Sequence, residues 1–244
     1  MRPRFPFLAT VTASVAFLIL VGLGTWQLER LRWKEDLIAR VQARTAETPV
    51  PLPEVPAWED LDLVDWEYRP VEVRGRFHHA LEARVYTLLS DPHGPLSGPG
   101  YWIMTPLEVS GSSASVFVNR GFVPAQEAGD VPRPEGEVTV RGLLRAPEGR
   151  NLFTPDDEPA RKIFYARDPA ALAAGLRVSS AAPFTIDASE TPPGGLPQAG
   201  ETRLDFPNRH LEYALTWYGL AGALAAVFAA FLSRRLHQRD GSEA

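Results

Sequence analysis

The chain has 244 residues, with 25 Lys and Arg residues against 30 Asp and Glu residues, a formal net charge of −5 and no cysteine. The absence of cysteine excludes a disulfide framework, a thiolate metal site and a cysteine nucleophile. The acidic balance argues against a nucleic-acid-binding protein, which would carry a basic face. Hydrophobic residues make up 45% of the sequence, and the longest uncharged runs lie near its two ends.

Each end carries a long apolar run. No charged residue occurs in positions 7–23 or in positions 213–232. Because a helix needs about 20 mostly apolar residues to cross a bilayer, both runs are predicted to be transmembrane helices. A cleaved signal peptide is the alternative for the first run, since Gly22-Leu23-Gly24 offers small residues at a suitable spacing.

The residues after the first run favour an uncleaved helix. The stretch from Trp26 to Arg44 contains no helix breaker and places Trp26, Trp33 and Val41 on one helical stripe. It is therefore predicted to continue the first span as an amphipathic stalk. Trp26 and Trp33 fit an aromatic belt at the membrane surface, and packing on the adjoining domain is the alternative for Trp33.

Basic residues flank both spans. Arg2 and Arg4 precede the first, and Arg234, Arg235 and Arg239 follow the second. Positive charge in short flanking segments stays in the cytoplasm, so both tails are predicted to be cytoplasmic and the intervening domain to lie outside. The four residues before Phe5 are too few for a mitochondrial transit peptide. The expected location is therefore a bacterial inner (plasma) membrane, with a multi-pass chain.

The predicted fold class is two transmembrane α-helices flanking one β-rich α+β extracytoplasmic domain, built as an antiparallel sheet or partly closed barrel. The expected boundaries are a cytoplasmic tail at 1–6, helix 1 at 7–25, the stalk at 26–45, the domain at 46–209, helix 2 at 210–232 and a second tail at 233–244. Strands are predicted at Tyr68–Phe77, Ala83–Leu89, Tyr101–Val109, Ser115–Val123, Glu137–Leu144 and Pro183–Asp187.

Two local signals complete the domain. The proline-rich stretch at 49–56 predicts an extended connector. One helix is predicted with Asp168 as its N-cap, Pro169 at its first position and Gly175 at its end.

Signals for catalysis are absent. The sequence has no Gly-x-Ser-x-Gly elbow, no Walker loop and no His-Glu-x-x-His zinc helix. His78 and His79 are neighbours in a predicted strand, where their side chains would point to opposite faces, so they are interpreted as surface histidines. We expect no enzyme activity, and an exported hydrolase has no catalytic constellation to support it.

The start of the second span carries the candidate site. Pro207 and Asn208 predict a helix that begins around Arg209, which places His210 in its first turn. The helix macrodipole disfavours a cation there and so favours the neutral imidazole that binds iron. Tyr213 and Trp217 follow on the same face one and two turns further. On this chemistry alone, an aromatic belt at the interface is the alternative interpretation.

The second span also carries a packing signal. Small residues recur at four-residue steps at Gly222, Ala226 and Ala230, and again at Gly219 and Ala223. Small residues at this spacing let helices approach closely in lipid. They predict the face that contacts the first span.

Five motifs follow one another along nearly the whole chain. They are GTWQLERLRWKEDLI at 24–38, YRPVEVRGRF at 68–77, GYWIMTPLEV at 100–109, VNRGFVP at 118–124 and NRHLEYALTWYGLA at 208–221. In this order and spacing they resemble the Surfeit locus family of cytochrome c oxidase assembly factors. The departures from the family lie in the middle of the chain, where its Phe-x-Pro-x-Asn pattern reads Phe153-Thr154-Pro155-Asp156-Asp157 and the aromatic-rich run that follows reads Arg161-Lys162-Ile163-Phe164-Tyr165.

The resemblance implies a membrane assembly factor that binds haem a and helps deliver it to the catalytic subunit of a haem-copper oxidase. It implies His210 as the haem ligand, with Tyr213 and Trp217 beside the ring. The implied partners are that subunit, the haem a synthase and membrane lipid, with no nucleic acid. The alternative function is a membrane-tethered scaffold that stabilises oxidase subunits without binding haem.

Overall fold

A computed structural model describes residues 7–127, 129, 131–202, 204 and 208–240. The chain divides into two compact units. One, the helical unit, combines Met1–Arg40 with Asp205–Ala244, and the other, the sheet unit, is Val41–Leu204.

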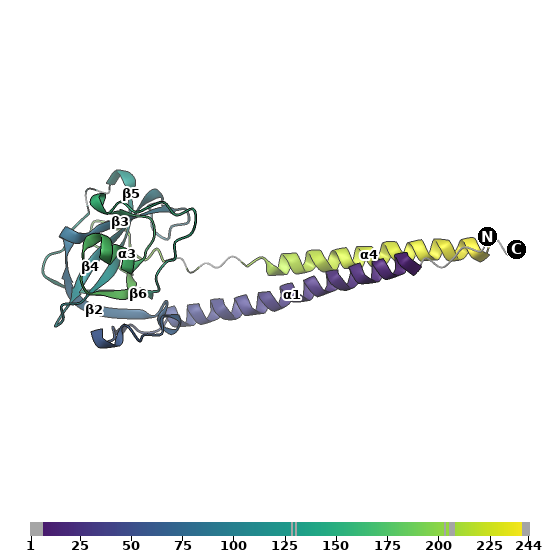
Figure 1. Ribbon diagram of the computed structural model, residues 1–244, viewed down its shortest axis with the longest axis horizontal. Helices are drawn as coiled ribbons and strands as arrows, with labels where there is room; N and C mark the ends of the chain where they lie inside the picture. Colours follow the sequence, from purple (N-terminus) through teal and green to yellow (C-terminus); the bar gives the residue numbers. More distant parts are fainter. Residues whose placement is uncertain (1–6, 128, 130, 203, 205–207, 241–244) are drawn as a thin grey trace. The chain divides into compact units, whose positions relative to one another are not determined.

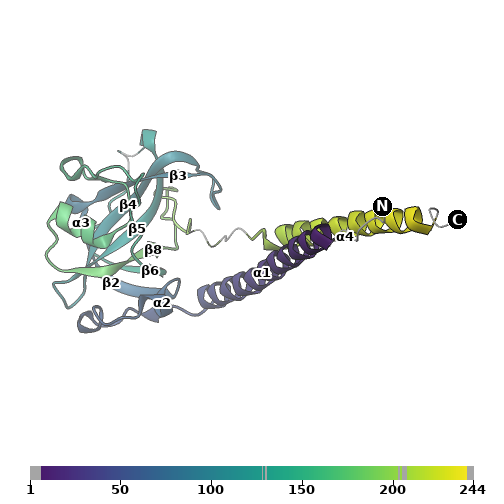
Figure 2. The ribbon, with the colours of Figure 1, turned by 45° about the vertical axis from the view of Figure 1, so that its right-hand side comes forward.

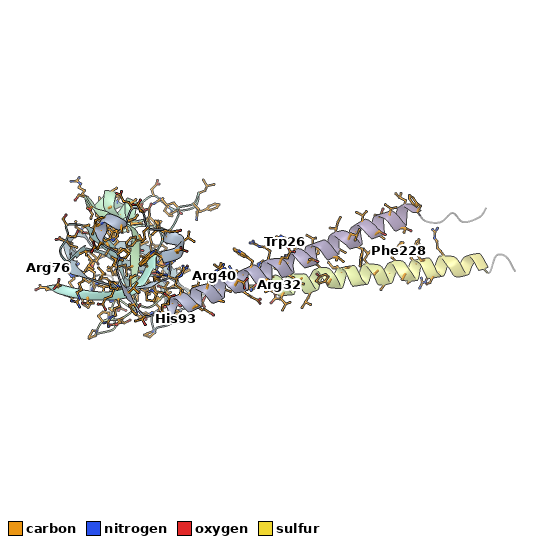
Figure 3. All side chains as sticks on the ribbon, turned by 90° about the horizontal axis from the view of Figure 1, so that it is seen from below. Trp26, Arg32, Arg40, Arg76, His93 and Phe228 are labelled. Atoms are coloured by element: carbon orange, nitrogen blue, oxygen red, sulfur yellow. The ribbon has the colours of Figure 1, made fainter. Side chains whose placement is uncertain are left out.

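Two long helices form the helical unit. They are α1 (Phe7–Thr45), whose last residues belong to the sheet unit, and α4 (His210–Asp240). The two lie side by side and run in opposite directions, and Trp26 on α1 and Phe228 on α4 mark them in the view of their side chains (Figures 1 and 3). Both helices are long and apolar enough to cross a membrane, with mean hydropathies of 2.2 and 1.8 in their most apolar stretches. The unbroken course of α1 confirms that the stalk continues the first apolar run.

The sheet unit holds an eight-stranded sheet (Figures 1 and 2). Its spatial order is β1-β2-β6-β8-β5-β4-β3-β7, and β2 also pairs with β4, so five of the strands form a closed circuit of pairings. The strands are β1 (Val50–Pro51), β2 (Pro70–Phe77), β3 (Ala83–Leu89), β4 (Gly98–Val109), β5 (Ser115–Pro124), β6 (Glu137–Arg145), β7 (Ile163–Phe164) and β8 (Ala181–Ala188).

The sheet is mixed, which corrects the expectation of a purely antiparallel one. β5 pairs in parallel with β8, β1 with β2, and β3 with β7. A parallel pair needs a long crossover connection, and for β5 and β8 the chain between them, which includes β6 and α3 (Pro169–Leu176), supplies it. Every residue of β5 is buried, so this strand is central to the unit.

Three apolar clusters hold the described part of the sheet unit together. The largest includes Phe184 and Trp58, whose rings meet edge to face at a centroid distance of 5.6 Å. In the second cluster, Leu172 of α3 packs with Phe117 and Phe164, and α3 lies at the edge of the unit in Figure 2. Burial of such side chains is worth about 1.5–3 kcal/mol each, which makes these clusters the main stabilising contacts of the unit.

Two local predictions need correction. The proline-rich connector contains strand β1, whose Val50 and Pro51 align with Val71 and Glu72 of β2, because a proline at a sheet edge needs no ladder hydrogen bond on its open side. Helix α3 begins as predicted, with Asp168 accepting a hydrogen bond from the Ala170 amide. It ends at Leu176 rather than Gly175, and Arg177 takes the left-handed cap position with φ 59°.

Candidate functional site

His210 is the first residue of α4, and its ring contacts the other long helix. The imidazole Nδ1 lies 2.7 Å from Oε1 of Gln27 on α1. An amide oxygen can only accept a hydrogen bond, so Nδ1 carries the proton. In the neutral ring the lone pair is then on Nε2, which makes that nitrogen the one able to coordinate a metal.

A second contact between the helices lies close to the first. The Thr25 hydroxyl is 3.1 Å from the Tyr218 hydroxyl. A Cβ added at Gly24 would lie 2.8 Å from a ring atom of Tyr218, closer than packed atoms approach. Glycine at this position therefore allows the Tyr218 ring to lie directly on the backbone of α1.

The face of α4 that contacts α1 differs from the predicted one. Ala214 and Ala221 are 1% and 3% exposed. Gly219 and Gly222 are exposed, and a Cβ at either would meet nothing within 4 Å. The prediction that Gly222 packs against the first helix was therefore wrong. Residues three and four apart share a helix face, and the row that begins at His210 continues through Ala214, not through the glycines.

The predicted site residues differ in how far they are buried in the structure. His210 and Trp217 are partly buried, whereas the Tyr213 side chain is 53% exposed. Asn208 was expected to cap α4, but its buried Oδ1 has no hydrogen-bond partner. Pro207, expected to stop the chain before the helix, lies outside the described residues.

The other described histidines of the sheet unit are engaged elsewhere. His78 lies just beyond β2 and bonds Glu108 at 2.6 Å, while His79 bonds the Pro134 carbonyl at 2.8 Å. His93 is largely exposed beside Glu201, with Nδ1 3.7 Å from the carboxylate. Within the described residues, no three His, Asp or Glu side chains gather into a metal site.

The sheet unit contains a buried charge cluster that no sequence pattern predicted. Asp187 of β8 is 3% exposed and lies in the wall of a cavity of about 410 Å³. Its oxygens accept hydrogen bonds at 2.8–3.1 Å from Asn119, Arg145, Arg167 and Thr202. Burial alone would raise the pKa of Asp187, but Arg167, Arg145 and these hydrogen bonds together hold it below its ordinary value.

Comparison with known proteins decides the family. The profile of the SURF1 family matches residues 14–222. The chain is 39% identical to mouse Surfeit locus protein 1, with 85% of this chain and 72% of that protein aligned, and 39% identical to the human protein over 83% and 70%. A SURF1-like protein of Monosiga brevicollis is 36% identical over 93% of this chain and 88% of its own length.

The chain belongs to the SURF1 family. This confirms the resemblance found in the motifs, and the SURF1 family is known as a family of cytochrome c oxidase assembly factors. The SURF1 match includes both sides of the helix contact. Gln27 lies in the motif at 24–38 and His210 in the motif at 208–221, so two of the segments that carry the resemblance meet at one hydrogen bond.

Sequence reasoning found His210 but missed Gln27 and Tyr218. Both lie inside motifs that were recognised, and Gln27 is three residues from Gly24. Only the antiparallel alignment of α1 with α4 brings them to their partners. The available signal was the pair of small residues Gly24 and Ala214, which mark where two helices can approach.

Proposed function

We propose that this SURF1 family member binds haem a through His210 and helps deliver it to the catalytic subunit of a haem-copper oxidase, with the haem a synthase as donor. α1 and α4 span the membrane in this proposal, and the sheet unit lies on the extracytoplasmic side of a bacterial inner membrane. The observation that carries the proposal is the 2.7 Å hydrogen bond from His210 Nδ1 to Gln27.

The residues at this contact fit a haem. Haem iron is commonly held by an imidazole nitrogen, and the Gln27 hydrogen bond leaves Nε2 as the coordinating atom and fixes the ring plane. Trp217 is partly buried two turns further along α4 and offers an apolar aromatic wall. The haem supplies an iron centre that accepts the lone pair, and the chain supplies the orientation of the ligand.

The test is the absorption spectrum of the purified full chain from cells that make haem a. The wild-type protein should show a Soret band, and His210→Ala should lose most of it. The substitution removes one partly buried hydrogen bond, worth about 1 kcal/mol, so the protein should remain folded. His93→Ala is the matched control, because His93 is an exposed histidine of the sheet unit and its loss should leave the spectrum unchanged.

The same experiment distinguishes haem binding and delivery from the alternative, a scaffold that holds oxidase subunits together. A scaffold that holds oxidase subunits without binding haem predicts no Soret band in the wild type, or a band that His210→Ala leaves intact. Either result would favour the scaffold. Trp217→Ala should weaken haem binding less than His210→Ala, because it removes ring contact and leaves the His210 imidazole in place.

A further inference from the structure

The sheet unit presents two large apolar side chains to solvent at the tip of one loop. Leu152 and Phe153 are 100% and 93% exposed, the highest values among the large hydrophobic residues described in this unit. Single exposed apolar residues are ordinary, but adjacent ones at full exposure indicate a surface that is covered in the working protein. Leu88, which is 61% exposed, lines the same cavity as Asn151 and Thr154 of this loop.

Hydrogen bonds within the loop fix the shape of its tip. The Asn151 side chain accepts a hydrogen bond from the Phe153 amide at 2.8 Å, and Thr154 Oγ1 accepts one from the Asn151 amide at 3.0 Å. At the base, Arg150 pairs with Asp157 at 2.6 Å, and Asp157 also accepts from the Tyr165 amide. A loop ordered in this way loses little conformational entropy when its tip is buried.

The loop belongs to the part of the sheet unit from which the chain continues to α4. Asn151 and Thr154 line the cavity that Thr202 also lines, and the Thr202 hydroxyl donates to Asp187 at its wall. Thr202 precedes His210, the first residue of α4, by only eight positions. α4 is one of the two helices long and apolar enough to cross a membrane.

The charges around the tip do not point to an ionic partner. Arg150 is paired with Asp157, and Glu148 is paired with Arg167 at 3.2 Å, which leaves Asp156 as the exposed charge next to Phe153. An interface driven by anionic lipid or by an acidic protein would need a cluster of free basic residues. The tip instead offers an aliphatic and an aromatic side chain, a combination that favours the boundary between lipid headgroups and acyl chains.

We propose that Leu152 and Phe153 insert into the bilayer that α1 and α4 span, so that the sheet unit is held at the membrane by a third contact. The proposal rests on the membrane-spanning part of the proposed function and is independent of haem binding. A bilayer is the apolar phase that the proposed spanning helices bring to this chain, and two neutral side chains can enter it without bringing a charge. The contact restricts rotation of the sheet unit about the segments that join it to α1 and α4.

The chain lacks cysteine, which permits a direct test with single labelled cysteines. Leu152→Cys, Ser113→Cys and Val227→Cys would each carry an environment-sensitive fluorophore on the full chain in phosphatidylcholine nanodiscs. Ser113 is exposed in the turn between β4 and β5 and is the aqueous control, and Val227, 69% exposed on α4, is the lipid control. Quenching by nitroxide-labelled lipid and by aqueous iodide is then compared.

The fluorophores at 152 and 227 should be quenched by the nitroxide lipid several-fold more than the one at 113, and iodide should give the opposite order. Adding Phe153→Ser to the Leu152→Cys chain should reduce lipid quenching at 152, whereas Phe153→Leu should preserve it. Equal iodide access at 152 and 113, with normal lipid quenching at 227, would overturn the inference and leave the spanning helices in place. Absence of lipid quenching at 227 would overturn both the insertion of the loop tip and the membrane span of α4. Shielding at 152 only after the oxidase catalytic subunit is added would assign the tip to a protein partner and refute membrane insertion.

Discussion

Removing the charge of Asp187 is expected to cause one of the largest stability losses that a single substitution can produce in the sheet unit. The carboxylate is 3% exposed and joins Asn119 of β5, Arg145 of β6, Arg167 and Thr202. Asp187→Asn keeps the shape of the side chain but leaves two guanidinium groups, each 14% exposed, without their shared anion. Breaking a buried ion pair by removing one partner costs about 3–5 kcal/mol.

Thermal unfolding of the full chain in nanodiscs, followed by near-ultraviolet circular dichroism, would measure this loss. For a unit of this size, 1 kcal/mol shifts Tm by about 2–4 °C, so Asp187→Asn should lower Tm by about 6–20 °C. The matched control is Glu72→Gln, which breaks the exposed pair between Glu72 and Arg141 on the same sheet. Because water screens that exposed pair, its loss should lower Tm much less than Asp187→Asn does.

The pH dependence gives a second measure of the same cluster. The pKa of Asp187 is lower in the folded protein than in the unfolded chain, so its contribution is fully present above the unfolded value of about 3.9 and is lost as pH falls toward the folded value. When the pH is lowered below about 4, the Tm of the wild type should therefore decrease by more than the Tm of Asp187→Asn. If Asp187→Asn matched the Glu72→Gln control at neutral pH, the cluster would not be a stabilising element and the reasoning would be refuted.

Three further predictions concern the helical unit and its orientation. Gln27→Ala should lower haem affinity about 10–100-fold, the usual effect of removing a group that orients a metal ligand, and titration with haem measures this loss. Gln27→Glu should retain haem and lower its reduction potential, which spectroelectrochemistry measures. Gly24→Leu should separate α1 from α4, because its Cβ would lie 2.8 Å from the Tyr218 ring, whereas Gly222→Leu should not. Spin-label distances between the two helices measure the difference. An equal effect of the two substitutions would contradict the contact between Gly24 and Tyr218. In intact cells, an impermeant maleimide should label Ser113→Cys from outside and Ser233→Cys only after permeabilisation, and the reverse pattern would invert the proposed topology.

Sequence patterns predicted the longer strands to within three residues at each end, including β5, which is buried on both faces. β3 coincides with its predicted range, Ala83–Leu89, and its residues alternate in exposure over much of its length. The two-residue strands β1 and β7 were missed because two residues carry no period. Their pairing depends on neighbours brought in from elsewhere in the chain, which no local pattern records.

The end of α3 shows how tertiary contact changes the role of a residue. Gly175 was expected to end the helix, since glycine takes the left-handed cap position at low cost. In the structure Gly175 lies inside the helix, where a Cβ would come within 2.8 Å of the Phe164 ring. Glycine is required there for close packing, and Arg177 adopts the left-handed conformation instead.

The candidate site likewise combines a residue that the sequence identifies with residues that only the fold brings together. His210 could be identified because its position relative to the apolar run is a local property of the sequence. Gln27 could not, because it is 183 positions away and only the antiparallel contact joins the two. The Asp187 cluster draws its members from β5, β6, β8 and the segments before and after β8, so its charges look in the sequence like ordinary surface residues.

The proposed function requires a site that releases its ligand as well as binding it, and the helical unit is better suited to this than the sheet unit. The sheet unit is fixed by its apolar clusters and a buried charge network, so changing a site within it would cost several of these contacts together. At the helix contact, His210 is oriented by one hydrogen bond between helices that approach through Gly24 and Ala214. A small separation of the helices would break that hydrogen bond and allow the imidazole ring to turn. If His210 holds the haem as proposed, a partner helix that competes for the same face of α4 would therefore weaken the hold of His210 as it binds, and docking of the acceptor would be coupled to release of the haem.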